Sequence, residues 1–310
     1  RSVADTTKTL SVDGGTIKLD GNFPTGSQNV AFGDTALDSL TTGGDNNVAI
    51  GHAALTTVIT GDQNIAIGTN ALRDNTASQN TAIGFHAMVA NSSGASNTAV
   101  GYGSLDANTT ASNNSAFGHL ALSANTTGTA NSSLGQFALG ANTTGGQNTA
   151  SGRYALGANT TGGSNTAFGN EALNTNQTGS SNTAVGAYAL DANNNASNNT
   201  AVGSAALGAN TTGADNVAVG AYAGYTLTTA TNCTFIGKNS GYYTTTGNHN
   251  TAVGENSLLQ NTTGSQNNAF GVTAGDAITT GLYNNVFGYG AGGAVTTANG
   301  NTAMGHTALS

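Results

Sequence analysis

Apolar and polar residues recur at a fixed interval along this chain. Once per interval an alanine, a larger apolar residue and a glycine occur close together, and positions rich in Asn, Thr and Gly fill the rest. This glycine, which we call the ruler glycine, recurs 17 times from Gly33 to Gly305 at a spacing of 17 residues, apart from an early slip to 18 that a spacing of 16 corrects. Such an unbroken period predicts one supersecondary unit stacked on copies of itself.

The positions before the ruler glycine are the most regular. Asn stands four residues before it in 16 of 17 units, with Cys233 as the exception, and Ala stands two residues before it in 14 units. The residue directly before it is apolar in 16 units, and Ser151 breaks that rule. A disordered low-complexity tract would have no reason to keep these residues in phase, whereas a stacked core would.

The unit predicts short strands rather than helix. Its glycine and its several Asn and Thr residues disfavour helix, and no 3.6-residue apolar period is present. In an extended Asn182–Gly186, Thr183 and Val185 would point to one side and Ala184 to the other, and both sides are restricted in type. We therefore expect the strand to be covered on both sides. With about two short strands and two turns per unit, residues 29–310 are predicted to form an all-β, parallel β-solenoid (β-roll) of about 17 coils.

Residues 1–28 lie outside the repeat. Thr9–Val12 and Thr16–Leu19 alternate as two strands should, on either side of a turn sequence, Asp13–Gly15. This segment is predicted to cap the exposed end of the solenoid.

Stacked coils place identical residues above one another. The Asn column can then pass amide hydrogen bonds from coil to coil, as side-chain ladders do in stacked β structures. We predict such a structural ladder along the column; in the middle of the array its members are Asn148, Asn165, Asn182, Asn199 and Asn216.

A coil of 17 residues encloses a thin apolar core. The strict Ala column suggests a close approach by another backbone, which is either a second wall of the same coil or a neighbouring chain. We favour a neighbouring chain, because small cores usually gain buried surface by oligomerisation.

The repeat resembles those of known fibres. The phrase NTAVG at Asn182–Gly186, followed by an Ala-Leu pair, is similar to the head repeat of trimeric autotransporter adhesins, and the longer phrase NTTGxxNTAxGxxAL at Asn159–Leu173 is closer to the repeat arrays of phage tail fibres. The resemblance implies a left-handed parallel β-roll in an intertwined homotrimer. It also implies a structural fibre segment on a virion or in the extracellular space, which presents or forms an element for attachment to a host or surface and meets a cell-surface glycan or protein receptor.

Composition narrows the partners. Six Lys and Arg residues stand against fourteen Asp and Glu residues, so the chain has no basic stripe for nucleic acid. No apolar run approaches the roughly 20 residues of a spanning helix, so membrane insertion is not expected.

Residues for catalysis are scattered, so we expect no enzyme, no metal and no cofactor. His52, His119 and His306 follow ruler glycines but never in adjacent coils. Asp106 and Asp191 share a phase but are five coils apart, at least 20 Å at about 4.8 Å per coil, too far for a glycosidase pair.

Two alternative functions remain open. Thr-Thr pairs such as Thr160-Thr161 recur at one phase and could form an ice-binding face, although adjacent residues of a strand point to opposite sides. Tyr154, Tyr188 and Tyr222 recur on every second coil and could stack on the sugar rings of a glycan, or they could shield the seam between chains, which we favour.

Overall fold

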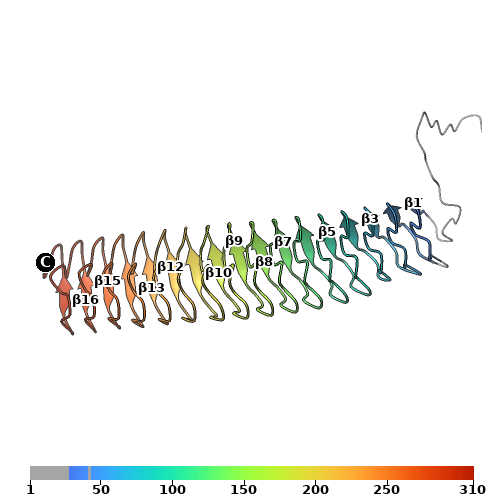
Figure 1. The fold of residues 1–310 in the computed structure, drawn as a ribbon. Helices are drawn as coiled ribbons and strands as arrows, with labels where there is room; N and C mark the ends of the chain where they lie inside the picture. Colours follow the sequence, from blue (N-terminus) through green and yellow to red (C-terminus); the bar gives the residue numbers. More distant parts are fainter. Residues whose placement is uncertain (1–27, 41–42) are drawn as a thin grey trace, which may run out of the picture.

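The computed structural model describes residues 28–40 and 43–310. These residues form a single file of similar coils that makes an elongated rod (Figure 1). The predicted strand pair over Thr9–Leu19 lies outside the described residues. No described residue is helical, and the predicted all-β, parallel β-solenoid with a 17-residue repeat is confirmed.

Each repeat contributes one strand of three residues, which ends directly before the ruler glycine. The strands are β1 (Val30–Phe32), β2 (Val48–Ile50), β3 (Ile65–Ile67), β4 (Thr81–Ile83), β5 (Thr98–Val100), β6 (Ser115–Phe117), β7 (Ser132–Leu134), β8 (Thr149–Ser151), β9 (Thr166–Phe168), β10 (Thr183–Val185), β11 (Thr200–Val202), β12 (Val217–Val219), β13 (Thr234–Ile236), β14 (Thr251–Val253), β15 (Asn268–Phe270), β16 (Asn285–Phe287) and β17 (Thr302–Met304). Each pairs in parallel with the strand of the next coil, in a register that places Ala184 beside Ala167 and Ala201.

The expectation of two strands per coil is wrong, because the segment after the ruler glycine forms turns. In this segment the second and fourth residues after the glycine have left-handed backbone, as in Tyr188 (φ 60) and Leu190 (φ 52). Residues other than glycine rarely adopt this conformation, so their side chains gave no sign of it. The turns nevertheless bond between coils, since the Leu190 amide donates to the Ala206 carbonyl at 3.0 Å.

The ruler glycine is required for two reasons, its backbone conformation and the close approach of the next coil. Gly186 has φ 138, and a Cβ built on it would lie 2.5 Å from the carbonyl oxygen of Gly203 in the next coil. A side chain at this position would therefore strain the backbone and separate the coils, which explains why the glycine recurs in every unit.

The core lies within each coil. Ala184 at the middle of β10, Ala189 and Leu190 are fully buried, and their counterparts form one continuous apolar cluster along the rod. The Ala column thus packs inside its own chain against the second wall of the coil, and the prediction that it meets a neighbouring chain is wrong.

The outer side of the strands is open in the single chain. Val185 is 39% exposed and Phe168 45%, although both belong to the regular apolar column. The expectation that the strand is covered on both sides is therefore wrong for one chain taken by itself.

The later coils are repacked around one large side chain, Phe235. Phe235 replaces an Ala of the column and is fully buried. A Cβ on Gly224 would lie 2.8 Å from its ring, and a Cβ on Gly241 would also overlap the ring. These glycines stand where earlier coils have a core Leu, so Phe235 occupies volume that two leucines would otherwise need.

Candidate binding surfaces

Three features of the rod carry polar or exposed groups in regular order: the two Asn ladders inside, the strand face, and the face that follows the ruler glycine.

The Asn column before the ruler glycine is buried and bonds from coil to coil. The backbone N–H of Asn165 donates to Oδ1 of Asn148 at 2.9 Å, and the backbone N–H of Asn182 donates to Oδ1 of Asn165 at 3.0 Å. Nδ2 of Asn165 donates to the Gly179 carbonyl at 2.8 Å. The same backbone-to-side-chain bond joins Asn182 to Asn199 and Asn199 to Asn216.

Cys233 continues this column where Asn is missing. Its amide donates to Oδ1 of Asn216 at 2.9 Å, and its thiol contacts the Gly247 carbonyl at 3.3 Å. Burial raises the pKa of the thiol to about 11. The residue therefore packs as a small buried side chain rather than as a reactive nucleophile.

A second ladder was missed by the sequence reasoning. Nδ2 of Asn159 donates to Oδ1 of Asn142 at 2.8 Å and to the Gly162 carbonyl at 3.0 Å, and Oδ1 of Asn159 accepts from Asn176 at 2.8 Å. The ladder's members are fully buried: Asn75, Asn91, Asn108, Asn125, Asn142, Asn159, Asn176, Asn193, Asn210 and Asn261. Their signal in the sequence is the constant phase of the first residue of N-T-T.

This second ladder also explains the many N-x-S/T sequons. Asn108, Asn125, Asn142 and Asn159 begin such sequons, but their amide groups are buried and hydrogen-bonded. In the folded chain they are not accessible as glycosylation acceptors.

The strand face carries a long row of partly exposed apolar side chains. It consists of the side chains at the first and third positions of each strand. The third positions, which we call the apolar column, include the exposed residues Phe32, Ile50, Ile83, Phe117, Leu134, Phe168, Val185, Val219, Ile236, Phe270, Phe287 and Met304. Phe270 and Phe287 stack along it with ring centroids 5.0 Å apart. No charged residue occurs in any of the 17 strands of the described chain.

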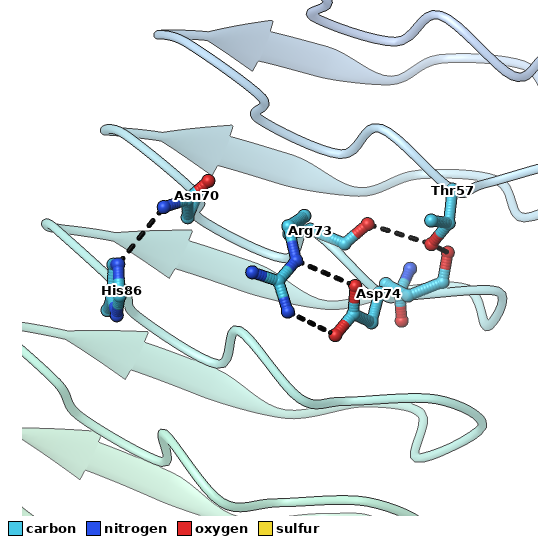
Figure 2. A network of polar contacts seen from close by, with 6 residues as sticks. Thr57, Asn70, Arg73, Asp74 and His86 are labelled. Atoms are coloured by element: carbon cyan, nitrogen blue, oxygen red, sulfur yellow. Dashed lines mark hydrogen bonds and ion pairs between the residues drawn. The ribbon is translucent and has the colours of Figure 1, made fainter.

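The surface after the ruler glycine, which we call the groove face, carries most of the aromatic rings. It consists of the side chains one, two, five and six residues after each ruler glycine. Near the beginning of the rod it is polar: Arg73 donates two hydrogen bonds to Asp74 (2.8 and 2.7 Å), and Asn70 is 3.0 Å from Nε2 of His86 (Figure 2). The guanidinium of Arg73 lowers the pKa of the Asp74 carboxyl. Because both members of this ion pair are well exposed, it contributes little to stability.

Further along the groove face the rings stack from coil to coil. Ring centroids are 5.4 Å apart for Phe85 and Tyr102 and 5.0 Å apart for Phe137 and Tyr154, and both pairs are nearly parallel. Arg153 lies 4.9 Å above the ring of Tyr154. Tyr154, one of the three predicted ligand-binding tyrosines, thus has one ring face occupied by Phe137.

Tyr188 and Tyr222 are placed differently. They are 45% and 42% exposed, and Ala205, which stands at the same phase in the coil between them, is nearly buried. A groove of about 360 Å³ lies between the two rings, and we call it the tyrosine slot. Its lining consists of Tyr188, Asp191, Ser204, Ala205, Gly208, Tyr222 and Tyr225.

Asp191 is the charged group of this slot. Its Oδ1 is buried and has no hydrogen-bond partner among the described residues. Burial, with a smaller contribution from the nearby Glu171, raises the pKa of its carboxyl. Asp106 occupies the same phase five coils earlier and also has a raised pKa because of burial. The sequence placed both carboxylates in phase but gave no sign of their burial.

Within residues 28–40 and 43–310, no group of three or more His, Cys, Asp or Glu side chains is arranged to hold a metal ion. A search of the same residues for a helix with the length and apolar character of a membrane span found none. Neither the known protein-family models nor the curated protein sequences include a match to this chain.

Proposed function

We propose that the chain is a non-enzymatic shaft segment of a fibre on a virion or in the extracellular space, in which three parallel copies associate along their strand faces. The rod would hold an attachment element at a fixed distance from the particle or cell. The observation that carries the proposal is the apolar column, which runs uncharged and partly exposed along the described rod.

The area of the strand face supports association. Seventeen strands stacked at about 4.8 Å make a rod about 80 Å long. A band about 10 Å wide along it covers about 800 Å² on each copy, which equals the contribution of one partner to a standard interface. The apolar column makes up about half of this band, because the first strand position is Thr, Ser or Asn in 13 of 17 strands. An apolar strip of about 400 Å² is at the size at which exposed patches mark interaction sites.

The composition of the strand face supports a second copy of this chain as the partner. Interface cores are depleted of charge, as these strands are. The column repeats at the coil spacing over the whole rod, so a partner with the same length and spacing matches it best. Copies related by a closed rotation would keep their columns parallel, and the resemblance to trimeric fibres favours three copies.

The test is the mass of the purified chain in solution by light scattering. We expect three times the chain mass of 30.2 kDa. Val185→Asp combined with Val219→Asp places two charges in the interface and should yield monomers. The matched control is Thr161→Asp, which should leave the trimer intact. Thr161 is exposed and lies two residues after Asn159 of the second ladder, away from the strand face. A monomeric wild type, or a trimer that tolerates both charges, would refute the proposal.

Ice binding is the weaker candidate. In the Thr-Thr pairs the first hydroxyl donates to the carbonyl of the corresponding Thr or Gln in the next coil, for example from Thr143 to Thr160 at 3.0 Å and from Thr160 to Gln177 at 3.0 Å. The first hydroxyl of each pair therefore bonds to the next coil. Only the second threonines remain as a row that could face ice. Absence of thermal hysteresis in the purified protein would remove this candidate.

A further inference from the structure

The rings of the groove face follow one another at the spacing of a stack, and the tyrosine slot is a place where one ring is missing. Phe137 and Tyr154, on adjacent coils, have centroids 5.0 Å apart. Tyr188 and Tyr222 are two coils apart, about 10 Å at the usual strand spacing, with the small side chain of Ala205 between them. The gap therefore has room for one ring, about 5 Å from each tyrosine, within the range at which rings pack.

The slot is also lined by two polar side chains, Ser204 and Asp191. Ser204 contributes an exposed hydroxyl beside Ala205, and Asp191 contributes a half-buried carboxylate. A ligand hydroxyl can donate to the carboxylate oxygen other than Oδ1, since Oδ1 itself is shielded from the groove. The lining includes no Lys or Arg, and the chain carries a net charge of −8, so an anionic ligand would be repelled.

We propose that the tyrosine slot binds one ring of a neutral hexopyranose, whose C–H faces pack against Tyr188 and Tyr222 while its hydroxyls donate to Asp191 and bond with Ser204. Of the three tyrosines predicted to bind a glycan, Tyr188 and Tyr222 line this slot and Tyr154 does not. Asp191, Ser204 and Ala205 are additional lining residues. The sugar site does not depend on the proposed trimer, because all lining residues belong to one chain and to the groove face rather than the strand face.

The volume of the slot agrees with a single-ring site. At about 360 Å³ it lies at the small end of ligand pockets, which span roughly 300–1,000 Å³. It is a shallow groove on a rod, so a chain of sugars can extend along the groove face on either side of the bound ring. Tyr225, whose ring packs edge-on to Tyr222 with centroids 5.6 Å apart, fixes the Tyr222 wall.

The experiment uses the purified chain in its native assembly. Dextran, mannan and galactan oligosaccharides are the neutral probes and a polysialic acid oligomer is the anionic one. Saturation-transfer NMR detects contact with the sugar, and tyrosine fluorescence gives the affinity, because the chain has nine Tyr and no Trp. At least one neutral probe is expected to bind, and the anionic probe is expected to bind more weakly.

Ala205→Tyr is the sharpest variant. Tyrosine is already accepted at this phase with a similar backbone, since φ is 53 at Ala205 and 60 at Tyr188, so the variant should fold and its ring should fill the slot and abolish binding. Tyr222→Ala should weaken binding about tenfold, which corresponds to the loss of one ring contact. Tyr283→Ala removes a tyrosine that is 56% exposed five residues before a ruler glycine, and it should leave binding unchanged.

Binding of none of the neutral probes by the wild type, or binding that survives Ala205→Tyr, would overturn the inference. Light scattering on the same samples separates the two proposals. A monomer that binds the sugar would support the sugar site and refute the trimer. A trimer that does not bind the sugar would refute only the sugar site.

Discussion

Replacing Asn165 by Ala tests whether the ladder before the ruler glycine stabilises the rod. The wild-type side chain makes two kinds of contact with the next coil. Its Oδ1 accepts hydrogen bonds from the Asn182 amide at 3.0 Å and from Nδ2 of Asn182 at 3.2 Å, and its Nδ2 donates to the Gly179 carbonyl at 2.8 Å. All of these groups are buried.

The magnitude follows from which groups lose their partners. The Gly179 carbonyl still accepts from Asn176, and Nδ2 of Asn182 still donates to the Ala196 carbonyl. The Asn182 backbone amide has no other acceptor among the described residues, so one buried N–H per chain is left unpaired. Such a group costs about 1–3 kcal/mol, and in a trimer the cost arises three times.

Hydrogen exchange of the Asn182 amide is the direct assay. If local opening becomes easier by about 1–3 kcal/mol, exchange should accelerate roughly 5- to 150-fold. The midpoint of denaturant unfolding should also fall. The matched control is Asn195→Ala, at an exposed position with no side-chain hydrogen bond to any described residue, where the change should stay within about 0.5 kcal/mol. Equal stability and equal exchange in the two variants would show that the column is only a turn preference.

Three further outcomes are expected. Phe235→Ala should destabilise the later coils by about 3–5 kcal/mol, and adding Gly241→Leu should recover part of the loss in the same denaturant titration; no recovery would contradict the volume exchange. Because the pKa of Asp191 is raised above 3.8 in the folded chain, the folded state holds its proton more tightly and stability falls as pH rises above that value. Asp191→Asn should reduce this fall and be more stable than wild type at pH 7, and an unchanged pH profile of thermal unfolding would refute the assignment. The Cys233 thiol, buried and with its pKa raised to about 11, should resist a thiol reagent at pH 8 until the chain is unfolded; rapid labelling of the native protein would contradict its burial.

The sequence determined the parts of the fold that depend on period alone. Constant spacing of the ruler glycine fixed the number of units and their register, and the strands keep this register across the early spacings of 18 and 16 residues. The short strand before the glycine followed from period-two alternation, and the Asn column followed from the stacking of identical residues. Both follow because residues of equal phase lie above one another in stacked coils.

Only the tertiary structure decided which way each side chain points. The turns after the ruler glycine place residues such as Tyr188 and Leu190 in left-handed backbone, and neither residue type announces that conformation. The path of these turns directs Leu190 inward, leaves Tyr188 and Tyr222 outside, and makes Ala205 the floor of a slot. It also turns the Ala column into the core and leaves the apolar column open. A periodic pattern shows which residues recur in each coil, whereas the path of the backbone, with its left-handed residues in every turn, decides which of them point inward.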